Sequence, residues 1–199
     1  CEHGLDFILA AQFSNGGFPQ SYPGAKDFHA HITFNDYVMI GCLHVLKDAA
    51  DAAPHFAWLD AARRAKADAA VRSGVECILR CQLRVDGKLT GWCQQHDAQT
   101  YEARPGRTFE LASLCPQDTT EIVRFLMRLD SPGTAERRAI EEALQREADR
   151  EAALARAGRA LMTSLDTWRT AISLCQLACE LLAAFGTLEV SDAVDRFRF

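Results

Sequence analysis

The sequence lacks long apolar runs. No stretch of the 199 residues approaches the roughly 18 consecutive apolar residues that span a bilayer, and no signal-peptide pattern of charged, apolar and small residues is visible at Cys1. We therefore expect no membrane partner. The chain opens directly inside a helical pattern at Leu5, Phe7 and Ile8, and we interpret it as a mature or cut form.

An excess of basic residues is also missing. The formal net charge is −5 and the isoelectric point is near 5.7, so no general basic field is available to hold a nucleic acid. Any anionic partner has to be bound by a local group of residues. With 48% hydrophobic and 25% charged residues, the chain can bury one substantial core, and we expect a single domain over residues 1–199.

The eight cysteines lack the spacing of metal ligands. No Cys-x-x-Cys occurs, and Cys77/Cys81 and Cys175/Cys179 are i, i+4 pairs inside apolar helical stretches, where a small buried hydrophobic residue fits. We interpret the cysteines mostly as core residues. Zinc bound by the remaining cysteines and the histidines is the alternative, with Cys42, Cys93 and Cys115 as its candidates.

Strand-like alternation is nearly absent, whereas apolar residues recur at helical spacing throughout the chain. This periodicity predicts helices over residues 3–13, 35–50, 58–83, 117–129, 134–160 and 165–185. Glycine and proline interrupt the pattern at positions 15–17, 86–87, 131–133 and 186. The sequence therefore predicts an all-α fold.

Part of the helical series repeats. Gly4, Ile8, Leu9 and Gln12 recur seventy positions later as Gly74, Ile78, Leu79 and Gln82, and each set precedes a loop with a Gly-aromatic pair, Gly17-Phe18 or Gly91-Trp92. Repeated antiparallel helix pairs can curve into a toroid whose loops gather at one end. Such an arrangement predicts a common cleft, with aromatic and charged groups that suit sugar rings, from Phe18, Tyr22, Asp36, Trp92, His96, Asp97 and Arg107.

Two aspartates stand where a loop leads into a helix. Asp36 ends a loop rich in glycine, proline and aromatic residues, and Asp118 stands at the start of a later helical pattern. A carboxylate at such a position can cap the exposed amides of the helix. We favour capping for Asp118 and leave capping and function both open for Asp36.

Five motifs in order resemble those of polysaccharide lyase family 10, the pectate lyases with an α/α toroid. The resemblance covers about residues 4–140. The motifs are Asn15-Gly16-Gly17-Phe18-Pro19-Gln20 with Tyr22-Pro23, His31-Ile32-Thr33-Phe34-Asn35-Asp36, Trp92-Cys93-Gln94-Gln95-His96-Asp97, Arg107-Thr108-Phe109-Glu110 with Ser113-Leu114, and Phe125-Leu126-Met127.

The resemblance implies calcium-assisted β-elimination in polygalacturonate. It implies that Asp36 is a calcium ligand, with Asn35 and Thr33 as neighbouring oxygen donors, because calcium prefers oxygen ligands. Arg107 corresponds to a family arginine that serves as the base or as a grip on a substrate carboxylate; a structural salt bridge, with Glu110 as partner, is the third alternative.

Three further residues are candidates for substrate binding. His96 and Asp97 are predicted to orient the cleft wall, to contact substrate or to pack within their loop. Trp92 is predicted either to stack on a sugar or to lie buried between helices.

Some family segments have no counterpart here. An Asp-Asn-Gly segment with another calcium-site aspartate would fall before Cys1, and the downstream Arg-Arg-Asn-Gly-Tyr segment is not found; residues 134–199 are therefore predicted to be a divergent helical tail. The alternative to an active lyase is a truncated or degenerate scaffold that binds acidic polysaccharide without turnover. The resemblance also implies a secreted or periplasmic protein, which we expect to be a monomer.

Overall fold

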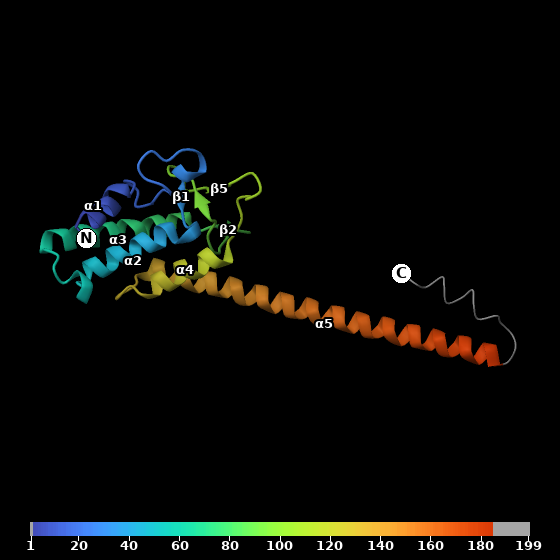
Figure 1. Ribbon diagram of the computed structural model, residues 1–199. Helices are drawn as coiled ribbons and strands as arrows, with labels where there is room; N and C mark the ends of the chain where they lie inside the picture. Colours follow the sequence, from blue (N-terminus) through green and yellow to red (C-terminus); the bar gives the residue numbers. More distant parts are fainter. Residues whose placement is uncertain (1, 185–199) are drawn as a thin grey trace. The chain divides into compact units, whose positions relative to one another are not determined.

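The computed structural model describes residues 2–184, without the side chains of residues 179 and 181–184. The chain separates into two compact units, Cys1–Glu147 and Ala148–Phe199. The last helix, α5 (Thr134–Ala184), begins in the first unit, and its residues from 148 onward belong to the second (Figure 1). Each unit is described by itself below.

Helices dominate the first unit, which confirms the predicted all-α class. They are α1 (Glu2–Ala11), α2 (Val38–Ala50), α3 (Ala61–Cys81), α4 (Pro116–Met127) and the start of α5, with short 3₁₀ turns η1 (Asp27–Ala30), η2 (Asn35–Tyr37) and η3 (Pro54–Phe56). Two predicted helices, 134–160 and 165–185, are one continuous helix over the described residues. The separation was wrong because no glycine or proline stands between residues 160 and 165 to end the helix.

Short strands tie the loops of the first unit together. β1 (Ile32–Thr33) pairs antiparallel with β4 (Gln95–His96), which pairs antiparallel with β5 (Ala103–Arg104). A separate hairpin joins β2 (Arg84–Val85) to β3 (Lys88–Leu89). The β1–β4 pairing brings the loop that leads to Asp36 beside the loop between Trp92 and Asp97.

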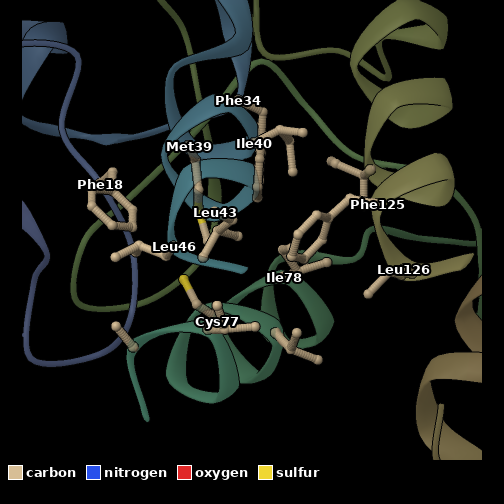
Figure 2. Packing of buried hydrophobic residues seen from close by; sticks show 14 of the residues in the cluster. Phe18, Phe34, Met39, Ile40, Leu43, Leu46, Cys77, Ile78, Phe125 and Leu126 are labelled. Atoms are coloured by element: carbon tan, nitrogen blue, oxygen red, sulfur yellow. The ribbon is translucent and has the colours of Figure 1, made fainter. Parts of the chain in front are cut away.

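The core of the first unit lies around α2. Figure 2 shows Met39, Ile40, Leu43 and Leu46 of this helix in one cluster with Ile78 of α3, and all five side chains are buried. Helices α2 and α3 pack closely at Gly74, where an added Cβ atom would lie 2.4 Å from the Cδ2 atom of Leu43. The buried side chains of these two helices therefore form one core. Phe18, Phe34, Phe125 and Leu126 add to it (Figure 2).

The sequence repeat has a structural counterpart in two glutamines. The Nε2 atom of Gln12 donates to the carbonyl of Gly16 in its own loop and to that of Ala70 in α3, both at 2.9 Å. The Nε2 atom of Gln82 donates to Thr90 in its own loop and to Ala139 in α5. Each glutamine thus joins the loop after its helix to another helix, which explains why it recurs.

In the second unit, residues 148–184 continue as helix with exposed apolar side chains such as Leu161, Leu165, Trp168 and Ile172. Among the described helices, none has an apolar stretch suited to crossing a membrane. The prediction of core cysteines is confirmed for Cys77, Cys81 and Cys93. It is wrong for Cys175, which is exposed, while the side chain of Cys179 lies outside the described residues.

Candidate active site

A pocket of about 250 Å³ in the first unit contains both Asp36 and Arg107. Asp36 comes from η2, directly after β1, and Arg107 comes from the loop after β5. The structure therefore places together the two residues for which the sequence predicts a metal-binding and a catalytic role. The other lining residues are Gln20, Phe28, His29, Asn35, Gln95 and Glu110.

Asp36 has a strained backbone and an exposed side chain. Its φ and ψ angles are 55° and 26°, and those of Tyr37 are 61° and 17°, so two successive non-glycine residues are left-handed. Such conformations cost about 1–3 kcal/mol each and are found at ligand sites. Tyr37, not Asp36, is the N-cap residue of α2, and no side-chain capping bond forms there. The capping interpretation of Asp36 therefore gains no support.

Two side-chain amides contact the carboxylate of Asp36. The Nε2 atom of Gln20 and the Nδ2 atom of Asn35 each lie 3.3 Å from its Oδ2 atom. A further amide, that of Gln94, donates to the Oδ1 atom of Asn35 at 3.4 Å. The pocket wall at Asp36 is thus built from oxygen-bearing polar groups.

Arg107 forms the predicted ion pair with Glu110. The backbone N–H of Arg107 donates to Oε2 of Glu110 at 3.0 Å, and the guanidinium donates to Oε1 of the same carboxylate. This pairing raises the pKa of Arg107 further above its usual value and lowers the pKa of Glu110. Because 58% of the Arg107 side chain is exposed, the guanidinium remains accessible from solvent.

Trp92 and His96 are not at the pocket surface, which corrects their prediction as substrate-contacting residues. Both are 0% exposed, and neither lines the pocket. The indole N–H of Trp92 donates to the carbonyl of Ile78 at 2.7 Å. His96 bonds the backbone of Cys93 and Tyr101 through its two ring nitrogens, and burial lowers its pKa, which favours the neutral ring. Phe18, also predicted at the cleft, is buried.

Asp97 organises its own loop. Its Oδ1 atom accepts hydrogen bonds from the backbone N–H groups of Gln99 and Thr100, and its Oδ2 atom accepts two from Arg104. The backbone donors of Thr100 and Gln99, followed by Arg104, lower the pKa of Asp97 to about 2. Asp97 does not line the pocket, so the loop-packing alternative describes its position.

The low pKa of Asp97 predicts an acid-dependent contribution to stability. The pKa in the folded state lies below its usual value of about 3.9, so the contribution is present above about pH 4 and is lost as the pH falls toward 2. We expect Asp97→Asn to melt roughly 5 °C lower at neutral pH. The difference from wild type should shrink below pH 4 in thermal unfolding. A difference that stays constant with pH, or an equal effect of Asp68→Asn at an exposed ion pair, would contradict this role.

Sequence reasoning missed the part that Gln20, Gln95, Phe28 and His29 take in the pocket wall. Gln20 and Gln95 stand inside motifs that were recognised, so their position was the available signal. Phe28 and His29 lie in the spacer between two motifs and carry no sequence signal of their own. Within the described residues, no group of three or more His, Cys, Asp or Glu side chains is placed to hold a metal ion. The zinc alternative therefore gains no support.

The fold resembles solved structures of polysaccharide lyases. An aspartate-to-alanine mutant of a family 10 polysaccharide lyase from Cellvibrio cellulosa, in complex with trigalacturonic acid, is 31% identical, with a TM-score of 0.70; the match covers 72% of this chain and 45% of that one. A second structure, a family 10 polysaccharide lyase from the same organism, gives 31% identity and a TM-score of 0.69, over 71% and 44% of the two chains. The chain thus spans less than half the length of these neighbours.

The family follows from the sequence match. The chain belongs to the pectic acid lyase family, whose model matches residues 1–186. Family 10 polysaccharide lyases have an α/α toroid fold, so the predicted fold and family are both confirmed. No curated protein matches the chain.

Proposed function

We propose that this chain is a pectate lyase that cleaves polygalacturonate by calcium-assisted β-elimination. The observation that carries the proposal is the pocket that joins Asp36 to Arg107 in a chain of the pectic acid lyase family. The bound trigalacturonic acid of one structural neighbour supports an acidic polysaccharide as the substrate class.

The chemistry requires an anion and a cation in one pocket. In a galacturonate residue the C5 proton lies beside a carboxylate, and negative charge develops on that carboxylate when a base takes the proton. The C4–O glycosidic bond then breaks, a C4=C5 double bond forms, and the leaving oxygen takes up a proton. A bound calcium ion would neutralise this charge. Asp36 would hold the ion, and the amide of Asn35, whose nitrogen now lies 3.3 Å from Oδ2 of Asp36, would offer its oxygen after a half-turn. A carboxylate and an amide oxygen fit a hard cation.

Arg107 is suited to hold the substrate carboxylate. Its ion pair with Glu110 raises its pKa, so the guanidinium stays cationic, and a planar fork of donors matches a carboxylate. Service as the base would require the opposite shift, and therefore displacement of Glu110. The ion pair with Glu110 therefore favours a role of Arg107 in binding the substrate carboxylate over a role as the base.

With Trp92 buried, Phe28 and His29 are the candidate aromatic residues for contact with a sugar ring. Their rings stack on each other with centroids 4.0 Å apart, and both residues line the pocket. Aromatic faces pack well against the apolar faces of sugar rings. We propose that this pair contacts the polysaccharide next to Asp36. Because a polymer of this size does not cross a membrane, we also propose a secreted or periplasmic location.

The test is an assay with polygalacturonate. We expect ultraviolet absorbance of the unsaturated product to rise when calcium is present and to stop rising when chelator is added. Absence of any calcium-dependent rise would contradict the lyase proposal. Polymer binding that persists without turnover, and is lost in Arg107→Ala, would instead identify a binding scaffold.

A further inference from the structure

The second unit exposes an apolar stripe along the part of α5 that Figure 1 shows in orange to red. Every residue from 151 to 178 is exposed, so the described part of this unit has no buried core. From position 154 to position 175 the stripe advances by alternating steps of four and three residues, and Gly158 is its one position without an apolar side chain. The other positions are Leu154, Leu161, Leu165, Trp168, Ile172 and Cys175. A helix of this kind is stabilised by a partner that covers the stripe.

The spacing of the stripe is that of a coiled coil. Its mean step is 3.5 residues and it runs over three heptads, which is long enough for two helices to pair. A helix on a globular core carries a wider apolar face, and one on a membrane has a strongly charged opposite face. The opposite face here carries Thr163, Thr167 and Thr170, whose hydroxyls donate to the carbonyls four residues earlier at 3.0, 2.9 and 2.9 Å. The stripe therefore fits one further helix.

The stripe is large enough to hold two copies of the chain together. Its four leucine and isoleucine side chains and Trp168 belong to residues that are each more than half exposed. Together they present roughly 500 Å² of apolar surface, so two copies would bury on the order of 1,000 Å², the size of a specific protein interface. A second copy also brings the same spacing of apolar residues, which a coiled coil requires of both helices.

The residues of the stripe fit an antiparallel pair better than a parallel pair. In a parallel pair each residue meets its own copy, so the two glycines at position 158 would leave a gap and the two tryptophans at position 168 would crowd each other. In an antiparallel pair with Leu165 opposite Trp168, Leu161 lies opposite Ile172 and Gly158 lies opposite Cys175. Large residues then meet large ones, and the glycine meets a small one.

The residues that flank the stripe support the antiparallel pair. Arg169 and Asp166 lie on the same side of the stripe, and this pairing brings Arg169 of one copy within about one helical turn of Asp166 of the other. The two-fold axis of such a dimer makes the contact twice. On the other side Ala157, Ser164 and Ala171 recur every seventh residue, and small side chains at a contact allow two helices to approach closely.

We propose that residues 151–178 of this chain form an antiparallel coiled coil with the same residues of a second copy. The pairing covers the exposed apolar side chains of both helices and sets opposite charges beside each other. The dimer would replace the monomer that was expected from the sequence.

The first test is the oligomeric state of the full chain, measured by sedimentation equilibrium over micromolar concentrations. We expect wild type to be a dimer. Leu165→Glu should raise the Kd of the dimer by about a hundredfold or more, because it places a carboxylate against Trp168 of the other copy. Leu177→Glu is the matched control: Leu177 is 53% exposed and Leu165 is 55% exposed, but Leu177 lies off the stripe. This variant should remain a dimer.

The second test is cross-linking of Gly158→Cys by a short thiol-specific reagent, followed by peptide mapping. An added Cβ at position 158 meets no atom within 4 Å in the chain, and Cys175 is exposed. The introduced thiol should be linked to Cys175 of the other copy, and adding Leu165→Glu should abolish the link.

Three results would overturn the proposal. The first is a wild-type monomer, including one that binds vesicles of anionic lipid through the stripe. The second is a link between the two copies of Cys175, which only a parallel pair brings together. The third is equal weakening of the dimer by Leu165→Glu and Leu177→Glu.

Discussion

Arg107→Ala is expected to lower kcat/KM on polygalacturonate by about a thousandfold. Arg107 is the cation of the pocket, and an arginine that holds charge in a transition state contributes a factor of this size. The variant should fold normally, because the Arg107 side chain is 58% exposed and its ion pair with Glu110 is local. The measurement is the initial rate of unsaturated product, compared with the melting temperature of each variant.

Arg72→Ala is the matched control for Arg107→Ala. Arg72 is also exposed and also paired with a nearby carboxylate, that of Asp68, but it lies outside the pocket that contains Asp36. It should retain wild-type activity. An equal loss in both variants would show that net charge, and not the position of Arg107, governs the rate.

The variant Arg107→Lys distinguishes binding of the substrate carboxylate by Arg107 from a role of Arg107 as the base. A lysine keeps the positive charge but has a pKa about 2 units or more below that of arginine. A base acts only when it is deprotonated, so its pKa sets the limb of the pH profile on which activity rises with pH. If Arg107 only binds the substrate carboxylate, the variant should show a higher KM and an unchanged rising limb. A rising limb displaced by about 2 units to lower pH would contradict this expectation and identify Arg107 as the base.

Trp92→Ala is expected to destabilise the first unit by about 3–5 kcal/mol. The side chain is 0% exposed within the core, and its indole N–H satisfies the buried carbonyl of Ile78. Since small proteins are stable by only about 5–15 kcal/mol, much of the chain should unfold near physiological temperature. Denaturant-induced unfolding measures the loss directly.

Trp58→Ala is the control for the tryptophan prediction. Like Trp92, Trp58 donates its indole N–H to a backbone carbonyl, in this case that of His55. In contrast to Trp92, 45% of Trp58 is exposed. Its loss should therefore cost much less. A Trp92→Ala variant that is as stable as wild type but binds polygalacturonate poorly would contradict the core role and restore the sugar-stacking alternative.

The helices and the family could be predicted because their signals are local. Apolar residues recur at helical spacing whether or not the partner helix is known. The glutamine at position 12 recurs at position 82, and each of the two bonds the loop that follows its own helix. Asp36 and Arg107 were found because each stands in a motif. The break predicted between residues 160 and 165 was wrong because periodicity weakens there without any helix-breaking residue.

Burial could not be predicted, because it depends on which loops pack together. Trp92, His96 and Asp97 share a motif with Gln95, yet only Gln95 lines the pocket, since the pairing of β4 with β1 decides which side chains face it. Phe28 and His29 belong to no motif and reach the pocket through the path of the loop between residues 20 and 31.

The sequence by itself determined the all-α class and the family and singled out Asp36 and Arg107 as candidates, because helical periodicity and motifs depend on residues close together along the chain. Only the tertiary structure decided that these two residues share a pocket and that Trp92 and His96 are buried. Residues 20, 36 and 107 line one pocket because of how the loops pack, and no spacing along the sequence encodes this arrangement.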